Sequence, residues 1–148
     1  MADDHPSKEL TCREPTVEDL RELCRALNDR GAKYVVIGGF AIRAAGYIRA
    51  TMDVDVIVAA DHENQARVFA ALATLPDHAA SELQPGELQQ YDVIRVADEI
   101  VVDVMRSAGG IDYAEAATDV VIHQVDGVSI PFASPRLLWR MKVITHRE

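Results

Sequence analysis

The chain has 148 residues and a formal net charge of −9 at pH 7, which suits one domain with a hydrophobic core of its own. The acidic balance argues against binding nucleic acid through a broad basic surface and leaves room only for a local basic patch. No apolar run approaches the roughly 18 residues of a membrane span, and the two cysteines, Cys12 and Cys24, without a signal-peptide pattern predict free thiols in a cytoplasmic protein.

The first predicted helix follows a stretch without periodicity. Residues 1–15 show no apolar repeat, so we expect a flexible leader there and a single domain over 16–148. Thr16 and Asp19 have the spacing of a capping box, and apolar residues then recur at helical spacing until Gly31. We therefore expect an amphipathic helix to begin the domain.

A strand, a glycine turn, a short helix and a second strand come next. The run KYVVIGG (33–39) predicts a strand that ends at Gly38 and Gly39, and FAIRAAGY (40–47) favours a short helix. The run MDVDVIVAA (52–60) predicts the second strand, and the apolar periodicity after it predicts a further helix.

The middle of the chain alternates between irregular segments and strands. Residues 76–90 lose the apolar pattern, so we expect a flexible connection that faces the substrate. The runs DVIRVA (92–97) and EIVVDVM (99–105) predict two strands joined at Asp98–Glu99, and GGIDYAEAA (109–117) predicts a turn and a short helix.

A hairpin and a helix come last. Asp126–Gly127 suits a two-residue primed turn between the apolar runs of residues 120–133, and Ser134 with Pro135 opens a helix. That helix has an apolar stripe, which we interpret as buried or, alternatively, as the contact of a homodimer: Leu137, Leu138, Trp139 and Met141. Interleaved helices and strands with an antiparallel hairpin indicate an α/β fold, a mixed β-sheet flanked by helices.

Three aspartates stand in otherwise apolar strands. Because side chains alternate along a strand, Asp53 and Asp55 share one face, with Cα atoms about 6.5 Å apart. Asp103 alternates with valines in a second strand that could pair beside the first. Three convergent carboxylates would form a hard oxygen site suited to Mg²⁺. The alternative is that Asp53 and Asp55 line the solvated face of an edge strand.

The glycine pair and the aspartates together resemble a known superfamily. A turn at Gly38–Gly39 before a helix would let backbone N–H groups approach a phosphate. The segment GGFAIRAAGYIRATMDVDVIV (38–58), with a third aspartate on a later strand, resembles the nucleotidyltransferase superfamily of DNA polymerase beta-like fold. Together with VDGVSIPFASP (125–135) and LLWRMK (137–142), it looks like the minimal bacterial nucleotidyltransferases related to AbiEii-type toxins. The Gly-Gly pair departs from the Gly-Ser of much of the superfamily.

This resemblance implies an activity and a set of functional residues. It implies that Asp53, Asp55 and Asp103 bind two Mg²⁺ ions, and that Asp103 also helps to deprotonate the attacking hydroxyl. The implied reaction transfers a nucleotidyl group from a nucleoside triphosphate (NTP) to an acceptor hydroxyl and releases pyrophosphate. The acceptor would be tRNA, a partner protein or a small antibiotic.

Other basic and polar residues have two interpretations each. Arg49 and Thr51 share the side of Asp53 if the strand starts early, where Arg49 could contact the triphosphate or simply pair with an aspartate on the surface. The resemblance places Lys142 near the nucleotide, although a lysine on a helix is often only solvated. Arg95 faces either the aspartates or solvent, and solvent is favoured. The alternative function is a non-catalytic module of a toxin–antitoxin type system that binds a nucleotide or a partner.

Overall fold

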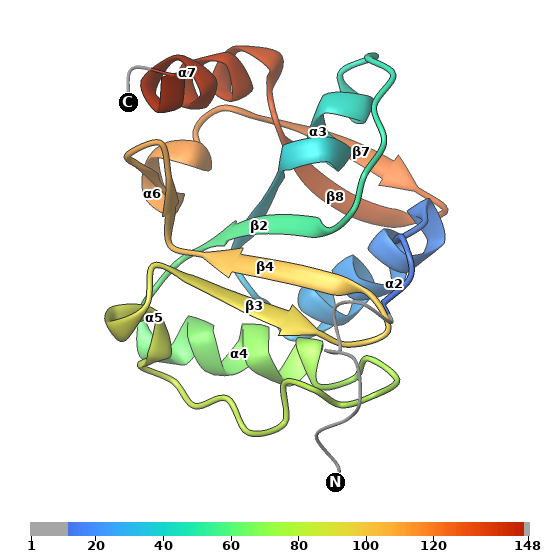
Figure 1. Cartoon of the computed structure of the whole chain (residues 1–148), viewed down its shortest axis with the longest axis vertical. Helices are drawn as coiled ribbons and strands as arrows, with labels where there is room; N and C mark the ends of the chain where they lie inside the picture. The colour runs from blue at the N-terminus through green and yellow to red at the C-terminus, as the bar shows by residue number, and fades with distance from the viewer. Residues whose placement is uncertain (1–11, 147–148) are drawn as a thin grey trace, which may run out of the picture.

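The computed structural model describes residues 12–146 and consists of one central sheet with helices on both sides (Figure 1). The sheet has six strands in the order β3-β4-β2-β1-β8-β7, and a separate two-stranded ribbon pairs β5 with β6. The strands are β1 (Tyr34–Ile37), β2 (Val54–Val58), β3 (Val93–Ala97), β4 (Val101–Met105), β5 (Ser107–Ala108), β6 (Ile111–Asp112), β7 (Val120–Val125) and β8 (Val128–Ala133). Element labels follow Figure 1.

Strand directions make this a mixed sheet. Strand β2 pairs parallel with β4 and antiparallel with β1, and β1 pairs parallel with β8. The two edges are formed by the antiparallel partners β3 and β7. The predicted α/β fold with a mixed sheet is confirmed.

Helices cover both faces of the sheet. They are α2 (Val17–Asp29), α3 (Gly38–Ala44), α4 (His62–Leu72), α5 (Glu87–Gln90), α6 (Tyr113–Ala116) and α7 (Pro135–His146). Figure 1 shows α2 and α4 on one side of the sheet and α3, α6 and α7 on the other. The apolar stripe of α2 (Leu20, Leu23 and Leu27) is buried in the core, which explains why this helix forms.

The expected capping box of α2 is present. The Thr16 hydroxyl accepts a hydrogen bond from the Asp19 backbone N–H, and the Asp19 carboxylate accepts one from the Thr16 backbone N–H. Arg13 adds a forked ion pair to Asp19 at 2.6 and 2.8 Å. Residues 1–11 of the expected leader lie outside the described residues, whereas the Arg13 backbone N–H donates to the Glu99 carbonyl at the β3–β4 turn.

The segment between α4 and β3 is packed. The backbone N–H groups of Asp77 and Ala79 donate to the buried Asp98 carboxylate, and those of Gly86 and Leu88 donate to the buried Gln65 side chain. These buried acceptors hold the segment on the α4 side of the sheet. The expectation that residues 76–90 form a flexible loop facing the substrate is therefore corrected.

The last hairpin and helix form where they are predicted, but one residue of the predicted apolar stripe is exposed. Asp126 and Gly127 both have positive φ, as a primed turn requires. In α7, Leu137 and Met141 are buried one turn apart, but Trp139 is 66% exposed. Trp139 lies two positions from Leu137, about 200° around the helix, so it cannot share the buried stripe.

Two further findings concern the described part of the chain. Neither Cys12 nor Cys24 forms a disulfide there. In the same residues, every helix is too short or too polar to cross a membrane.

Candidate functional site

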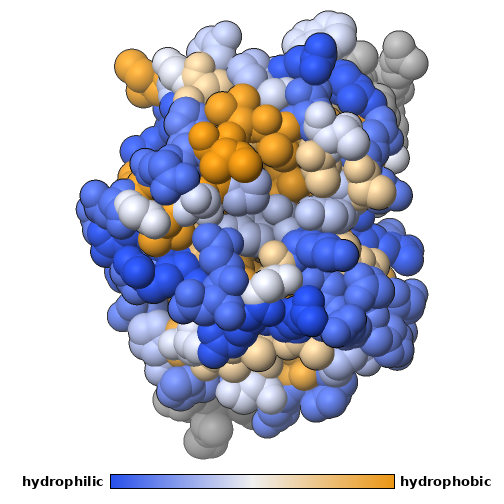
Figure 2. Space-filling model, turned by 180° about the vertical axis from the view of Figure 1, so that it is seen from behind, coloured by the Kyte–Doolittle hydropathy of each residue, from blue (hydrophilic) through white to orange (hydrophobic). Residues whose placement is uncertain are grey.

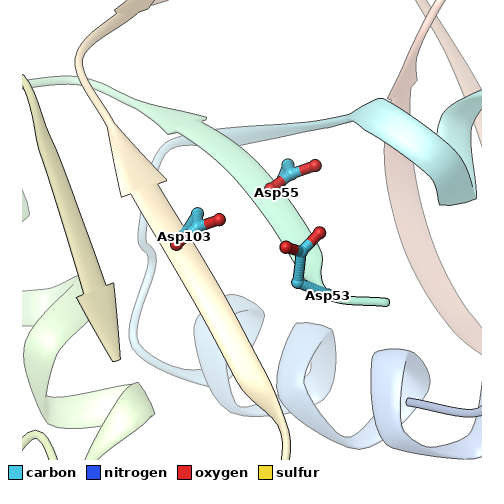
Figure 3. Close-up of side chains that lie close together, drawn as sticks. All are labelled: Asp53, Asp55 and Asp103. Atoms are coloured by element: carbon cyan, nitrogen blue, oxygen red, sulfur yellow. The ribbon is translucent and has the colours of Figure 1, made fainter. Parts of the chain in front are cut away.

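Three carboxylates from two neighbouring strands converge on the α3 side of the sheet (Figure 3). Asp55 in β2 is the register partner of Asp103 in β4, so their side chains share one face. Asp53 lies in the bend just before β2 and points to the same place. Each residue offers an oxygen, and these oxygens lie within 4.8 Å of one another.

The position of β2 in the sheet decides between the two interpretations of Asp53 and Asp55. Strand β2 lies between β4 and β1, and the side chains of Val54, Val56 and Val58 are buried. Because β2 is a central strand, the alternative of a solvated edge strand is wrong. Removing charged carboxylates from water costs free energy unless a cation or a hydrogen-bond donor pairs with them, so this cluster requires such a partner.

Burial and mutual repulsion disfavour full ionisation of the cluster. Loss of hydration, and then the neighbouring charges of Asp53 and Asp103, raise the pKa of Asp55 to about 7. Burial, followed by the charge of Asp103, also raises the pKa of Asp53. Two charges 4.8 Å apart at an effective dielectric constant near 20 repel by roughly 3 kcal/mol. The cluster is therefore built to accept a cation or a proton.

One arginine already neutralises part of this charge. Arg95 in β3 is the register partner of Asp103, and its Nε and Nη2 donate to the two Asp103 carboxylate oxygens, both at 2.9 Å. The same Nη2 lies 3.3 Å from Oδ2 of Asp53. The preference for a solvent-facing Arg95 is thus wrong, because the β3–β4 register turns this side chain toward the aspartates.

The glycine pair lies directly against the carboxylates. Gly38 and Gly39 are the first residues of α3, and Gly38 has φ +70°. A Cβ at Gly38 would stand 3.0 Å from Cγ of Asp55, closer than side chains tolerate. A Cβ at Gly39 would stand 2.6 Å from Cγ2 of the buried Thr51. Both positions thus require glycine for close packing, and at Gly38 the backbone conformation requires it as well.

Gly38 also lines a cavity. Its volume is about 660 Å³, and its walls come from α3, from residues 47–49, from the β5–β6 turn and from α7. Tyr47 and Trp139 give it aromatic walls, Arg49 and Lys142 give it positive charge, and no acidic side chain is among the described residues that line it. The cavity therefore suits an anionic ligand with a flat apolar part.

The remaining residues predicted for the site are distributed as follows. Arg49 and Lys142 line the cavity, whereas Thr51 is buried against Gly39. Because β2 begins only at Val54, the strand alternation does not extend back to Arg49 and Thr51. Trp139 is a cavity residue that the sequence pattern had suggested for the core or a dimer contact. The sequence indicated this position through spacing, because Trp139 follows Leu137 by only two residues in α7 and so lies on another side of the helix.

The donor set fits a divalent cation. Asp53, Asp55 and Asp103 supply only hard oxygen ligands, the type that Mg²⁺ prefers. Asp103 is buried, but the partial exposure of Asp53 and Asp55 leaves room for waters or phosphate oxygens, which Mg²⁺ usually retains as additional ligands. Arg95 holds two of the three carboxylates in place without the ion.

Comparisons with known proteins identify the fold and the family of the chain. The chain is similar in fold to TM1012 from Thermotoga maritima, a candidate nucleotidyltransferase with a solved crystal structure: the TM-score is 0.61 at 17% identity, over 88% of this chain and 84% of that one. No curated protein matches the sequence. Residues 16–136 match the family described as "Nucleotidyl transferase of unknown function (DUF2204)". With most of its length matched, the chain belongs to this nucleotidyl transferase family.

Proposed function

We propose that the protein is a Mg²⁺-dependent nucleotidyltransferase that moves a nucleoside monophosphate from an NTP to an acceptor hydroxyl. One observation carries the proposal: Asp53, Asp55 and Asp103 converge within 4.8 Å, and Gly38, which packs against Asp55, also lines the neighbouring cavity. A metal site and an anion-binding cavity are the two parts that phosphoryl transfer from a triphosphate requires.

The three aspartates are the proposed ligands of two Mg²⁺ ions. Bound Mg²⁺ would stabilise the developing charge on the attacking and leaving oxygens. The acceptor oxygen forms a bond to the α-phosphorus, the bond from that phosphorus to the pyrophosphate oxygen breaks, and pyrophosphate leaves. Asp103 is the proposed acceptor of the hydroxyl proton, which requires that Arg95 release at least one of its oxygens.

The cavity beside Gly38 is the proposed nucleotide site. Arg49 and Lys142 would contact the triphosphate oxygens, because their charges lie on the cavity wall without an acidic partner in that wall. The backbone N–H groups at Gly38 and Gly39 would approach the phosphates next to Asp55, with Thr51 supporting this turn from below Gly39. Tyr47 and Trp139 would pack against the base.

The acceptor belongs to one of three chemical classes. It is a hydroxyl of tRNA, of a partner protein or of a small molecule such as an antibiotic, and a protein acceptor would be consistent with the resemblance to toxin–antitoxin systems. The site of action is proposed to be the cytoplasm.

Transfer of an α-phosphate label tests this function. Each labelled NTP is incubated with the protein and Mg²⁺, together with tRNA, with a cell protein extract or with candidate small-molecule acceptors such as antibiotics, and the label transferred to the acceptor is counted. We expect labelling by the wild type to fall by about 10²-fold or more in Asp103→Asn, the loss typical of an electrostatic catalytic group. Retained labelling in Asp103→Asn would contradict the proposal. Metal-dependent NTP binding without any transfer would instead indicate the non-catalytic module.

A further inference from the structure

Arg95 contacts the acidic cluster as a divalent ion would. Its Nε and Nη2 engage both carboxylate oxygens of Asp103 at 2.9 Å, and Nη2 also reaches Asp53 at 3.3 Å. One guanidinium group therefore bridges carboxylates from two positions of the sheet. Because both oxygens of Asp103 accept from Arg95, any oxygen that Asp103 would offer to a metal ion is already hydrogen-bonded to this arginine.

The geometry indicates a strong interaction of Arg95 with Asp103 and a weaker one with Asp53. The forked pair with Asp103 uses two parallel N–H groups, which is the preferred geometry of an arginine–carboxylate pair. The contact with Asp53 is longer and comes from a nitrogen already bonded to Asp103. The Arg95 side chain is also 44% exposed, so part of it already borders solvent.

We infer that Arg95 is a displaceable counter-cation that competes with divalent ions for Asp53 and Asp103 and thereby makes ion binding depend on the nucleotide. This inference rests on the proposed metal site. Without a ligand, Arg95 offsets part of the repulsion among the carboxylates and keeps them together. An ion entering alone must work against the guanidinium charge, whereas an ion that arrives with a triphosphate brings compensating negative charge.

A titration with Mg²⁺ in the absence of NTP tests the inference. The melting temperature of wild-type protein, Arg95→Gln and Arg95→Lys is followed over increasing Mg²⁺ concentration, because an ion that binds the folded state stabilises it by mass action. The matched control is Arg106→Gln, since Arg106 forms a comparable ion pair with Asp92 at 2.8 Å and is 42% exposed. This control removes an arginine of similar exposure whose ion pair is with Asp92 and not with any of the three aspartates.

The expected results separate competition from other roles of Arg95. In Arg95→Gln, the Mg²⁺ concentration at the midpoint should fall about tenfold or more, because a positive charge near the ion is removed. Arg95→Lys, which keeps the charge but loses the fork, should lie between wild type and Arg95→Gln. Arg106→Gln should titrate like the wild type. Without Mg²⁺, Arg95→Gln should also melt at a lower temperature than Arg106→Gln.

Two results would overturn the inference in different ways. If wild type binds Mg²⁺ and Arg95→Gln binds it equally or more weakly, Arg95 positions Asp103 rather than competing, and the metal site itself stands. If wild type, Arg95→Gln and Arg95→Lys all show no response to Mg²⁺, the metal site of the proposed function is refuted together with the role of Arg95.

Discussion

At the residue scale, Gly38 connects the acidic cluster to the cavity. Gly38→Ala should destabilise the fold by more than about 2 kcal/mol, since positive φ alone costs about 1 kcal/mol and the new Cβ would also collide with the Asp55 carboxylate. The matched control is Gly110→Ala, which has φ +78° and nothing within 4 Å of the added Cβ. Urea unfolding measures both variants. Equal destabilisation by Gly38→Ala and Gly110→Ala would show that the collision with Asp55 does not contribute to the loss of stability.

Single residues also show where sequence reasoning reaches its limit. The strand alternation was enough to predict that Asp53 and Asp55 would share a face, because that follows from local geometry. That Asp103 joins them depends on the register between β2 and β4, which pairs Asp55 with Asp103. The face on which the Arg95 side chain lies depends on whether the turn between β3 and β4 has two residues or three. A two-residue turn at Asp98–Glu99 would pair Arg95 with Val102, whereas the observed register pairs it with Asp103. A shift of one residue moves a side chain to the other face.

At the element scale, the N-terminus of α2 depends on its capping box. Thr16→Ala should lower the free energy of unfolding by about 1 kcal/mol, the usual loss of a helix cap. Thermal or urea unfolding checks this, and Glu18→Ala in the same exposed turn serves as a control. An unchanged stability of Thr16→Ala would contradict the role of the cap.

The same cap predicts a pH dependence. The hydrogen bond from Arg13 lowers the pKa of Asp19 to about 2, compared with its usual value of 3.8. Because the pKa is lowered by folding, the stabilisation is present above about pH 4 and is lost as the pH falls toward 2. The difference in unfolding free energy between wild type and Asp19→Asn should therefore shrink over this range. A difference that stays constant from pH 5 to pH 2 would argue against the ion pair.

Helix α7 carries the probe for ligand binding. Trp139 is the only tryptophan of the chain, is 66% exposed and lines the cavity. Saturating NTP with Mg²⁺ should change its fluorescence emission, because a base packed against the indole excludes water from it. Trp139→Phe should lose this signal and keep ligand-dependent stabilisation. Unchanged emission at an NTP concentration that stabilises the protein would place the nucleotide elsewhere.

At the scale of the whole molecule, the order of elements could be predicted better than their packing. The hairpin at Asp126–Gly127 follows from turn chemistry and apolar pattern, whereas the parallel pairing of β2 with β4 is known only from the structure. The fixed conformation of residues 76–90 could not be predicted, because it depends on buried side chains far away in sequence, Gln65 and Asp98. Figure 2 shows an apolar patch on the face seen from behind, in the part of the molecule where the edge strand β7 exposes Val121 and Ile122.

The central claim is that the three aspartates bind metal and nucleotide together. The most direct test is the melting temperature with each NTP, with and without Mg²⁺, for wild type and for the double variant Asp53→Asn, Asp55→Asn. We expect Mg²⁺ with the preferred NTP to raise the melting temperature of the wild type by several degrees more than Mg²⁺ alone does, at about 100 times the dissociation constant of the NTP. The double variant should show no such increase. No increase with any NTP, or an equal increase in the double variant, would contradict the claim.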